Sequence, residues 1–188
     1  MYLIIQSAIA AATLRGHFAP SSVKGGGSYY VESAATGEVL MRGADIAVFM
    51  RGAWRVAGTS LHLVSASNTS GTDPHFGSYT GTRAGWALTE APGVGSSSAV
   101  FETSLRNYES GVHFETSYPL GAEGTNHSVS SAHGVVIANW PAMRSLSPKL
   151  SSGGTLSWAG QFITPSRSRT YGLSGGPTVF FDDPRAGG

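Results

Sequence analysis

The chain has 188 residues, of which 40% are hydrophobic and 12% are charged, which is enough for one domain with a real core but short for two. Its formal net charge is +1 and its 12 Lys and Arg residues are scattered singly, so no basic stripe is present to bind nucleic acid. It has no cysteine, which excludes disulfides, thiol catalysis and thiolate metal sites. The 26 glycines and 9 prolines indicate many short elements joined by turns.

The first segment, residues 1–20, is apolar from Tyr2 to Leu14. It resembles the apolar part of a secretory signal but has no basic start, and the alternative is a first strand. The apolar run of about 13 residues is shorter than the roughly 20 that a membrane helix needs, so we expect no membrane partner. A secreted location fits this segment, and the sequence leaves the location open. We assign residues 21–188 to a single β-sandwich domain.

Short apolar runs that contain β-branched and aromatic residues continue along the rest of the chain and predict strands. Glycine punctuates these runs in residues 28–67, and residues 68–74 read as a loop because all seven are typical of turns. No apolar period of 3.6 residues is long enough for a major helix. The prediction is an all-β, antiparallel sandwich, of the galactose-mutarotase-like supersandwich or jelly-roll type. The later strands are expected at residues 84–90, 99–109, 111–119, 134–140, 155–163 and 177–182.

The tetrapeptide Phe-Glu-Thr-Ser occurs twice, at residues 101–104 and 114–117. Gly111 lies between the copies and can take the positive φ of a tight turn, so the two copies predict a β-hairpin. An even-length turn gives one apolar and one polar face, with Arg106 beside Glu115 or His113 according to register. The apolar face would hold Phe101, Thr103, Leu105, Val112, Phe114, Thr116 and Tyr118, and the polar face Glu102, Ser104, Arg106, Tyr108, His113, Glu115 and Ser117.

Glu102 and Glu115 share the polar face of this hairpin. Glycosidases use carboxylate pairs about 5 to 9.5 Å apart, so the geometry of the hairpin allows Glu102 and Glu115 to form an acid/base pair. Glutamates beside an arginine on a solvated sheet face are commonplace, and this interpretation is the favoured one. We therefore assign no catalytic residue.

Sugars stack on exposed aromatic rings while polar side chains bond to their hydroxyl groups. We expect substrate contacts from Trp140, Trp86, Asp73 and Arg83. For the tryptophans, Trp158 included, the alternative is a place in the core, and Trp140, just before Pro141, is the one expected to project from a sheet rim. No cofactor is implied. No metal site is assigned. A calcium site formed by Asp73, or by Asp182 and Asp183, is the alternative.

Several segments together resemble the amino-terminal β-sandwich of α-galactosidase-like glycoside hydrolases. They are "GTDPHFGSYTGTRAGWAL", "VFETSLRNYESGVHFETSYPLG", "VVIANWPAM", "LSWAGQFI" and "LSGGPTVFFDD", and the resemblance spans roughly residues 60–183. In that family a barrel with two catalytic aspartates follows the sandwich. This chain ends at Gly188, before any such barrel, so none of those aspartates has a counterpart here.

The resemblance implies an accessory or amino-terminal domain of a glycoside hydrolase, whose partners are a carbohydrate and a carboxy-terminal catalytic domain absent from this chain. The alternative is a free-standing, lectin-like carbohydrate-binding sandwich. A third interpretation, a complete jelly-roll glycanase, would need a row of acidic residues along one strand, which the sequence lacks.

Overall fold

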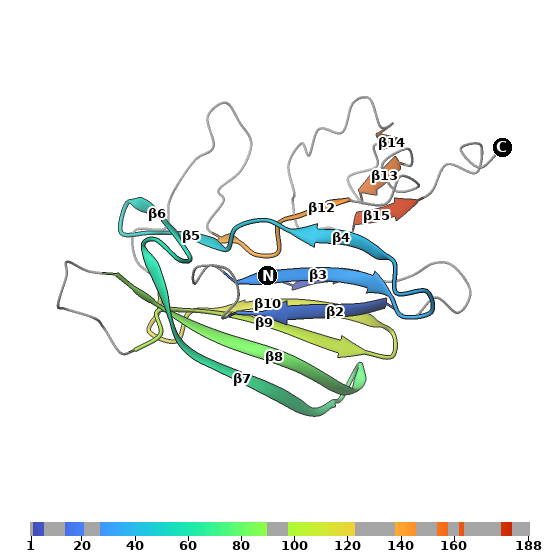
Figure 1. Ribbon diagram of the computed structural model, residues 1–188, viewed down its shortest axis with the longest axis horizontal. Helices are drawn as coiled ribbons and strands as arrows, with labels where there is room; N and C mark the ends of the chain where they lie inside the picture. The colour runs from blue at the N-terminus through green and yellow to red at the C-terminus, as the bar shows by residue number, and fades with distance from the viewer. Residues whose placement is uncertain are drawn as a thin grey trace.

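The fold is all-β, and its strands pair antiparallel (Figure 1). The computed structural model describes residues 2–5, 14–20, 27–89, 98–122, 138–145, 154–157, 162–163 and 178–181. The strands are β1 (Tyr2–Ile5), β2 (Leu14–Ala19), β3 (Ser28–Ser33), β4 (Val39–Gly43), β5 (Ala47–Met50), β6 (Ala53–Val56), β7 (Leu61–Asp73), β8 (Gly77–Leu88), β9 (Phe101–Tyr108), β10 (Gly111–Ser117), β11 (Ala138–Asn139), β12 (Met143–Ser145), β13 (Gly154–Ser157), β14 (Phe162–Ile163) and β15 (Thr178–Phe181). Within these residues, no helix is long and apolar enough to cross a membrane.

Two sheets form the sandwich. The five-stranded sheet has the order β1-β10-β9-β8-β7 and the four-stranded sheet the order β12-β4-β3-β2, and β2 packs across β9 and β10 (Figure 1). Two three-stranded sheets, β11-β5-β6 and β14-β13-β15, accompany them. The core between the main sheets is apolar and aromatic, and its largest fully buried side chains include Trp86, Tyr29, Phe101, Phe114, Ile46, Leu61 and Leu105.

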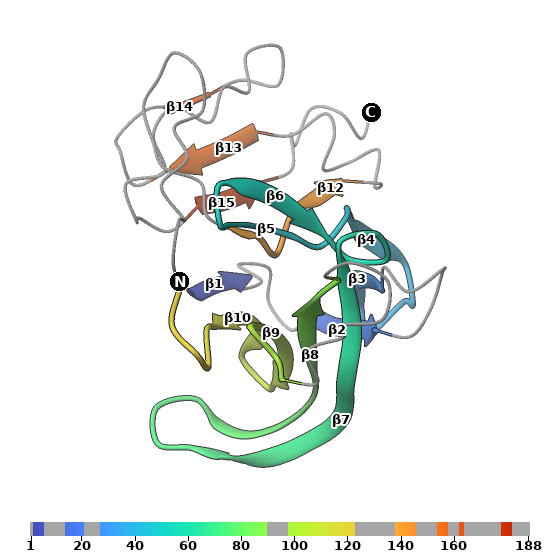
Figure 2. The ribbon, with the colours of Figure 1, turned by 90° about the vertical axis from the view of Figure 1, so that its left-hand side faces the viewer.

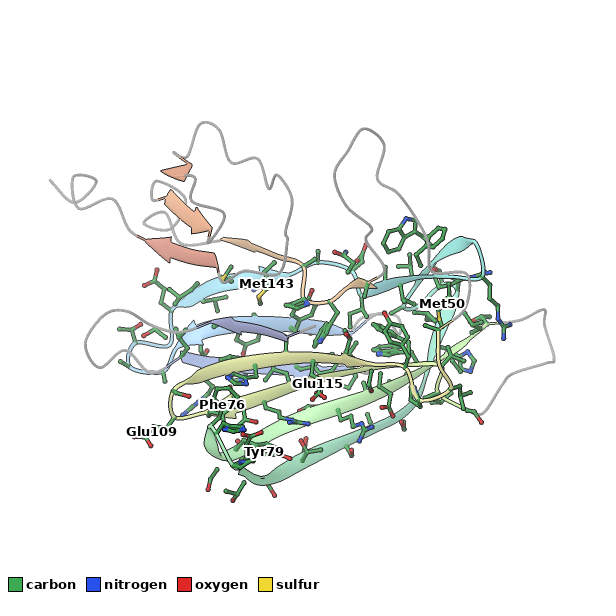
Figure 3. All side chains as sticks on the ribbon, turned by 180° about the vertical axis from the view of Figure 1, so that it is seen from behind. Met50, Phe76, Tyr79, Glu109, Glu115 and Met143 are labelled. Carbon is green, nitrogen blue, oxygen red and sulfur yellow. The ribbon has the colours of Figure 1, made fainter. Side chains whose placement is uncertain are left out.

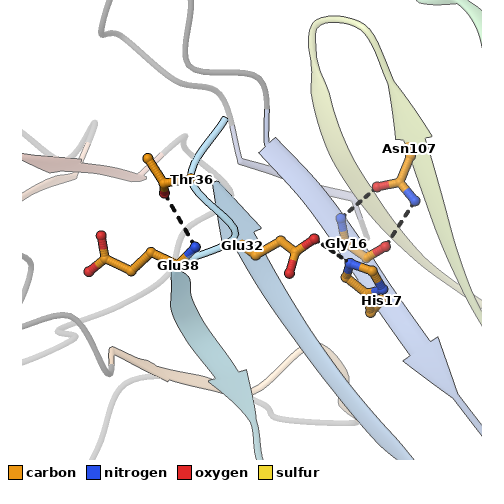
Figure 4. Close-up of polar contacts among 6 residues, drawn as sticks. All are labelled: Gly16, His17, Glu32, Thr36, Glu38 and Asn107. Atoms are coloured by element: carbon orange, nitrogen blue, oxygen red, sulfur yellow. Dashed lines mark hydrogen bonds and ion pairs between the residues drawn. The ribbon is translucent and has the colours of Figure 1, made fainter. Parts of the chain in front are cut away.

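Gly16 on β2 allows the two sheets to approach closely. A Cβ atom at this position would lie 2.6 Å from Val112 Cγ1 on the facing sheet, so a larger side chain would push the sheets apart. The side-chain amide of Asn107 binds the same residue from the other sheet (Figure 4). The Gly16 N–H donates to Asn107 Oδ1 at 2.6 Å, and Asn107 Nδ2 donates to the Gly16 carbonyl at 2.9 Å. Asn107 thus takes the place of a neighbouring strand at the open edge of β2.

The predicted hairpin is confirmed. Strands β9 and β10 join through a two-residue turn in which Gly111 pairs with Tyr108, and Gly111 has a φ of +153°, which L side chains rarely adopt. Arg106 lies opposite His113. The alternation of the sequence assigns the two faces correctly, because Phe101, Leu105 and the other apolar members point into the core.

The prediction of a loop at residues 68–74 is wrong for most of its length. These residues continue β7 to Asp73, and each pairs with β8, from Asn68 opposite Thr82 to Asp73 opposite Gly77. A turn-forming composition does not prevent a strand when a partner satisfies the backbone hydrogen bonds. The turn itself is formed by residues 74–76.

The tip of the long β7–β8 hairpin, which forms one side of the five-stranded sheet, curls toward β9 and β10 (Figure 2). A shift of register between Leu63 and Ser65 marks a bulge in β7, and such bulges increase the local twist of a strand. Because of this bend, Phe76 at the hairpin tip contacts side chains of β9 and β10.

The strand expected at 155–163 is instead a pair of strands, because Thr155 of β13 pairs antiparallel with Ile163 of β14. Within residues 134–140 the structure describes β11, and residues 134–137 lie outside the described residues. Tyr2–Ile5 forms β1, paired with β10.

Candidate functional site: the outer face of the five-stranded sheet

One face of the five-stranded sheet points away from the core, and we call it the outer face. The two-residue period of the strands puts the charged residues of β8, β9 and β10 on this face. The cross-strand register brings them into rows, with Arg83 opposite Ser104 and Ser104 opposite Glu115. Its members, with Phe76 from the β7–β8 turn, are Tyr79, Arg83, Glu102, Ser104, Arg106, Tyr108, His113, Glu115 and Ser117.

A first ion pair on this face joins Arg83 to Glu102. Ser117 donates a hydrogen bond to the same carboxylate oxygen, Glu102 Oε2, at 2.7 Å. Partial burial works against ionisation of Glu102, but the hydrogen bonds from Arg83 and Ser117 and the charge of Arg83 outweigh it and hold its pKa below the usual value. Glu102 is therefore ionised at neutral pH.

A second ion pair lies beside the first. Arg106 Nη2 is 2.8 Å from Glu115 Oε2, and the Ser104 hydroxyl donates to the same oxygen at 3.3 Å. The Arg106 guanidinium also lies over the Tyr79 ring, 4.9 Å from its centroid, in a cation–π contact. Arg106 is thus held from two sides, by a carboxylate and by an aromatic ring.

An aromatic cluster occupies the hairpin end of the outer face (Figure 3). Phe76 packs edge-on against His113, with ring centroids 4.3 Å apart, and contacts Tyr108 at 5.6 Å. Tyr108 in turn contacts Tyr79 at 5.4 Å. Phe76 remains 37% exposed, so its ring is fixed by neighbours on one side and open to solvent on the other.

His113 is almost fully buried in this cluster, with 5% of its surface exposed. Its Nε2 atom has no hydrogen-bond partner. Burial, together with the positive charge of Arg106, lowers the pKa of His113 despite the opposing charge of Asp73. The imidazole is therefore neutral at pH 7 and serves as an aromatic wall beneath Phe76.

The expected contact residue Arg83 does lie on the outer face, where its side chain is 54% exposed. Asp73 lies at the edge of this face and stabilises the β7–β8 turn. Its Oδ1 accepts hydrogen bonds from the backbone N–H groups of His75 at 2.8 Å and Phe76 at 3.2 Å, and the first of these is the main cause of its lowered pKa. Asp73 thereby fixes the turn that carries Phe76.

The two expected tryptophans are not on the surface, which corrects both predictions. Trp86 is 0% exposed and its Nε1 donates to Thr103 Oγ1 at 2.9 Å. Trp140 is 3% exposed and packs against Phe18 and Tyr29, with centroids 4.7 and 4.4 Å apart. Their large apolar rings fill the space between the sheets, so neither presents a face to a sugar. Trp158 lies outside the described residues.

Phe76 and Tyr79 were missed by sequence reasoning. The signal available was a pair of aromatic residues flanking Gly77 at a hairpin turn, in "HFGSY". The turn-forming composition of residues 68–74 hides this signal, because it predicts no strand that would carry the turn over the sheet.

Both glutamates of the outer face are engaged by arginines. Glu102 and Glu115 are diagonal neighbours, opposite Ser117 and Ser104 respectively, but an acid/base pair needs one carboxyl group with a raised pKa. Each carboxylate here has its own arginine. In the part of the chain that the structure describes, no group of three His, Asp or Glu side chains could hold a metal ion.

A smaller polar cluster lies on the four-stranded sheet (Figure 4). His17 Nε2 is 2.8 Å from Glu32 Oε1, and the His17 ring stacks on Tyr30 with centroids 4.4 Å apart. The outer face is the stronger candidate because it carries two ion pairs, one of which is joined to the aromatic cluster through Arg106 and Tyr79. Comparisons with protein-family models, curated proteins and solved structures find no match to this chain.

Proposed function

We propose that this protein is a carbohydrate-binding β-sandwich of the kind that accompanies the catalytic domain of a glycoside hydrolase, and that the outer face holds the sugar. The observation that carries the proposal is the position of Phe76. Its ring is 37% exposed, yet Tyr108 and His113 hold it in place at one end of a face that carries two ion pairs.

This combination suits a sugar because a sugar has two kinds of surface. Its C–H groups pack on a flat aromatic ring, and its hydroxyl groups exchange hydrogen bonds with polar side chains that are already oriented. Arg83 and Glu102 are oriented by their ion pair, and Glu115 is oriented by Arg106 and Ser104, so binding costs little loss of side-chain freedom.

The accessory role, as against catalysis by this chain, is supported by the ionic state of the carboxylates. Among the described residues of the outer face, Glu102 has a lowered pKa and Glu115 is paired with Arg106. Neither is set up as a general acid. A lectin-like protein that acts alone would use the same face, so one binding experiment tests the feature that both share.

The experiment is a glycan-array screen of the full chain, followed by calorimetry on the best ligand, with Phe76→Ala and Trp54→Ala as matched variants. Trp54 is 38% exposed, close to the 37% of Phe76, but lies on β6 of another sheet. We expect Phe76→Ala to weaken binding by about tenfold or more, the effect of about 1.4 kcal/mol, and Trp54→Ala to leave it unchanged. Failure of every glycan to bind, or equal losses in the two variants, contradicts the proposal.

A further inference from the structure

The charges of the outer face indicate which class of sugar it takes, provided that the proposed carbohydrate-binding function holds. An anionic sugar, such as a uronate or a sulfated glycan, is normally held by arginine or lysine whose charge is not already neutralised. The relevant question is therefore whether a cation on this face is left without a carboxylate.

Both arginines on the described outer face are neutralised. Arg83 pairs with Glu102, and Arg106 Nη2 lies 2.8 Å from Glu115 Oε2. An incoming carboxylate or sulfate would have to displace one of these glutamates or lie against it, and like charges at such distances repel.

The other described residues of the outer face add no positive charge. His113 is buried and neutral at pH 7. Strand β1 contains no charged residue, and β7 contains none between His62 and Asp73. The ionised groups at the hairpin end, Asp73 and Glu109, are acidic, so this end of the face repels anions further.

The polar side chains of the outer face also extend along the strands and are not gathered around one point. From Tyr79 to Arg83 the outer face of β8 extends over four residues, or about 13 Å at the usual rise of a strand, and Gly81 lies between them without a side chain. The Gly81 position lies against the β9 backbone, since a Cβ there would be 2.1 Å from the Leu105 carbonyl oxygen, but the whole stretch is longer than a single pyranose ring.

We infer that the ligand of the outer face is an uncharged, extended glycan, which lies along β8 and β9 between Phe76 and the Arg83–Glu102 pair. Its hydroxyl groups bond to charged side chains that already neutralise one another. A monosaccharide would reach only one end of this stretch and bind more weakly.

The test is calorimetry of the full chain with neutral oligosaccharides (cellohexaose, maltohexaose and mannohexaose), their monosaccharides, and two anionic chains (oligogalacturonate and a chondroitin sulfate oligosaccharide). We expect a neutral oligosaccharide to bind, its monosaccharide to bind at least about tenfold more weakly, and the affinity to change little between about 50 and 500 mM salt. An anionic chain that binds most tightly, with strong salt dependence, overturns the inference and leaves the proposed function standing. If no glycan binds, the proposed function itself fails.

A charge variant sharpens this test. Glu102→Gln leaves Arg83 without its carboxylate, so we expect the variant to gain affinity for oligogalacturonate by about threefold or more. Glu109→Gln removes the same charge from the β9–β10 turn, outside both ion pairs, and is the matched control with little expected gain. Equal gains in the two variants would mean that net charge decides binding, which overturns the role given to the ion pairs.

Discussion

Replacing Asn107 with alanine tests how the two sheets are joined. The change removes both hydrogen bonds to Gly16, which are 2.6 and 2.9 Å long and partly buried. A typical hydrogen bond contributes about 1 kcal/mol net, so we expect Asn107→Ala to lower the free energy of unfolding by about 2 kcal/mol. For a chain of this length such a loss lowers the midpoint of thermal unfolding by about 4 to 8 °C.

Urea denaturation followed by tryptophan fluorescence measures this loss, because Trp86 and Trp140 are buried and report the opening of the core. The matched control is Asn139→Ala, which removes one exposed hydrogen bond of 3.1 Å, to the carbonyl of Asp45. We expect this control to cost less than half as much. If the two variants lose equal stability, the joining role of Asn107 is refuted.

Two further predictions concern titratable groups. The pKa of His113 is lowered in the folded state, so the unfolded chain binds its proton more readily and stability falls as the pH drops from about 6.5 toward the folded pKa. His113→Phe should flatten this part of the curve of unfolding free energy against pH, and an unchanged slope would contradict the assignment. Burial raises the pKa of Tyr29 to about 12, and its hydroxyl donates to the Ala142 carbonyl at 2.7 Å and accepts from the Ala142 N–H at 2.8 Å. Tyr29→Phe should lower stability by about 1 to 2 kcal/mol and remove one late-ionising group from an ultraviolet pH titration, and a titration that keeps this group rules out the assignment.

The sequence predicts the β9–β10 hairpin well because its pattern is local. Apolar and polar residues alternate on both sides of Gly111, and only a turn with an even number of residues buries all the apolar side chains on one face. The faces of Glu102 and Arg106 follow from this pattern alone. The pattern reduces the neighbour of Arg106 to two choices, His113 or Glu115, and the structure uses both: His113 lies opposite Arg106, and Glu115 forms an ion pair with it.

The aromatic part of the site could not be predicted in the same way, because it depends on the bend of a long hairpin. Phe76 meets His113, 37 residues later in the sequence, only because β7 continues through residues 68–73 and curves over the sheet. Composition favoured a loop there. The tryptophans show a related limit, since an aromatic residue on a strand fits a surface or a core equally well until the facing sheet is known.

The most direct test of the account is a nuclear magnetic resonance titration of the full chain with a neutral oligosaccharide, following the backbone amide of each residue. We predict that the amides that shift belong to residues 76–83 and to the outer-face positions of β9 and β10, including Glu102 and Glu115. The β5–β6 hairpin with Trp54 should stay unchanged. Shifts confined to that hairpin or to the four-stranded sheet would contradict the assignment of the outer face as the carbohydrate-binding surface.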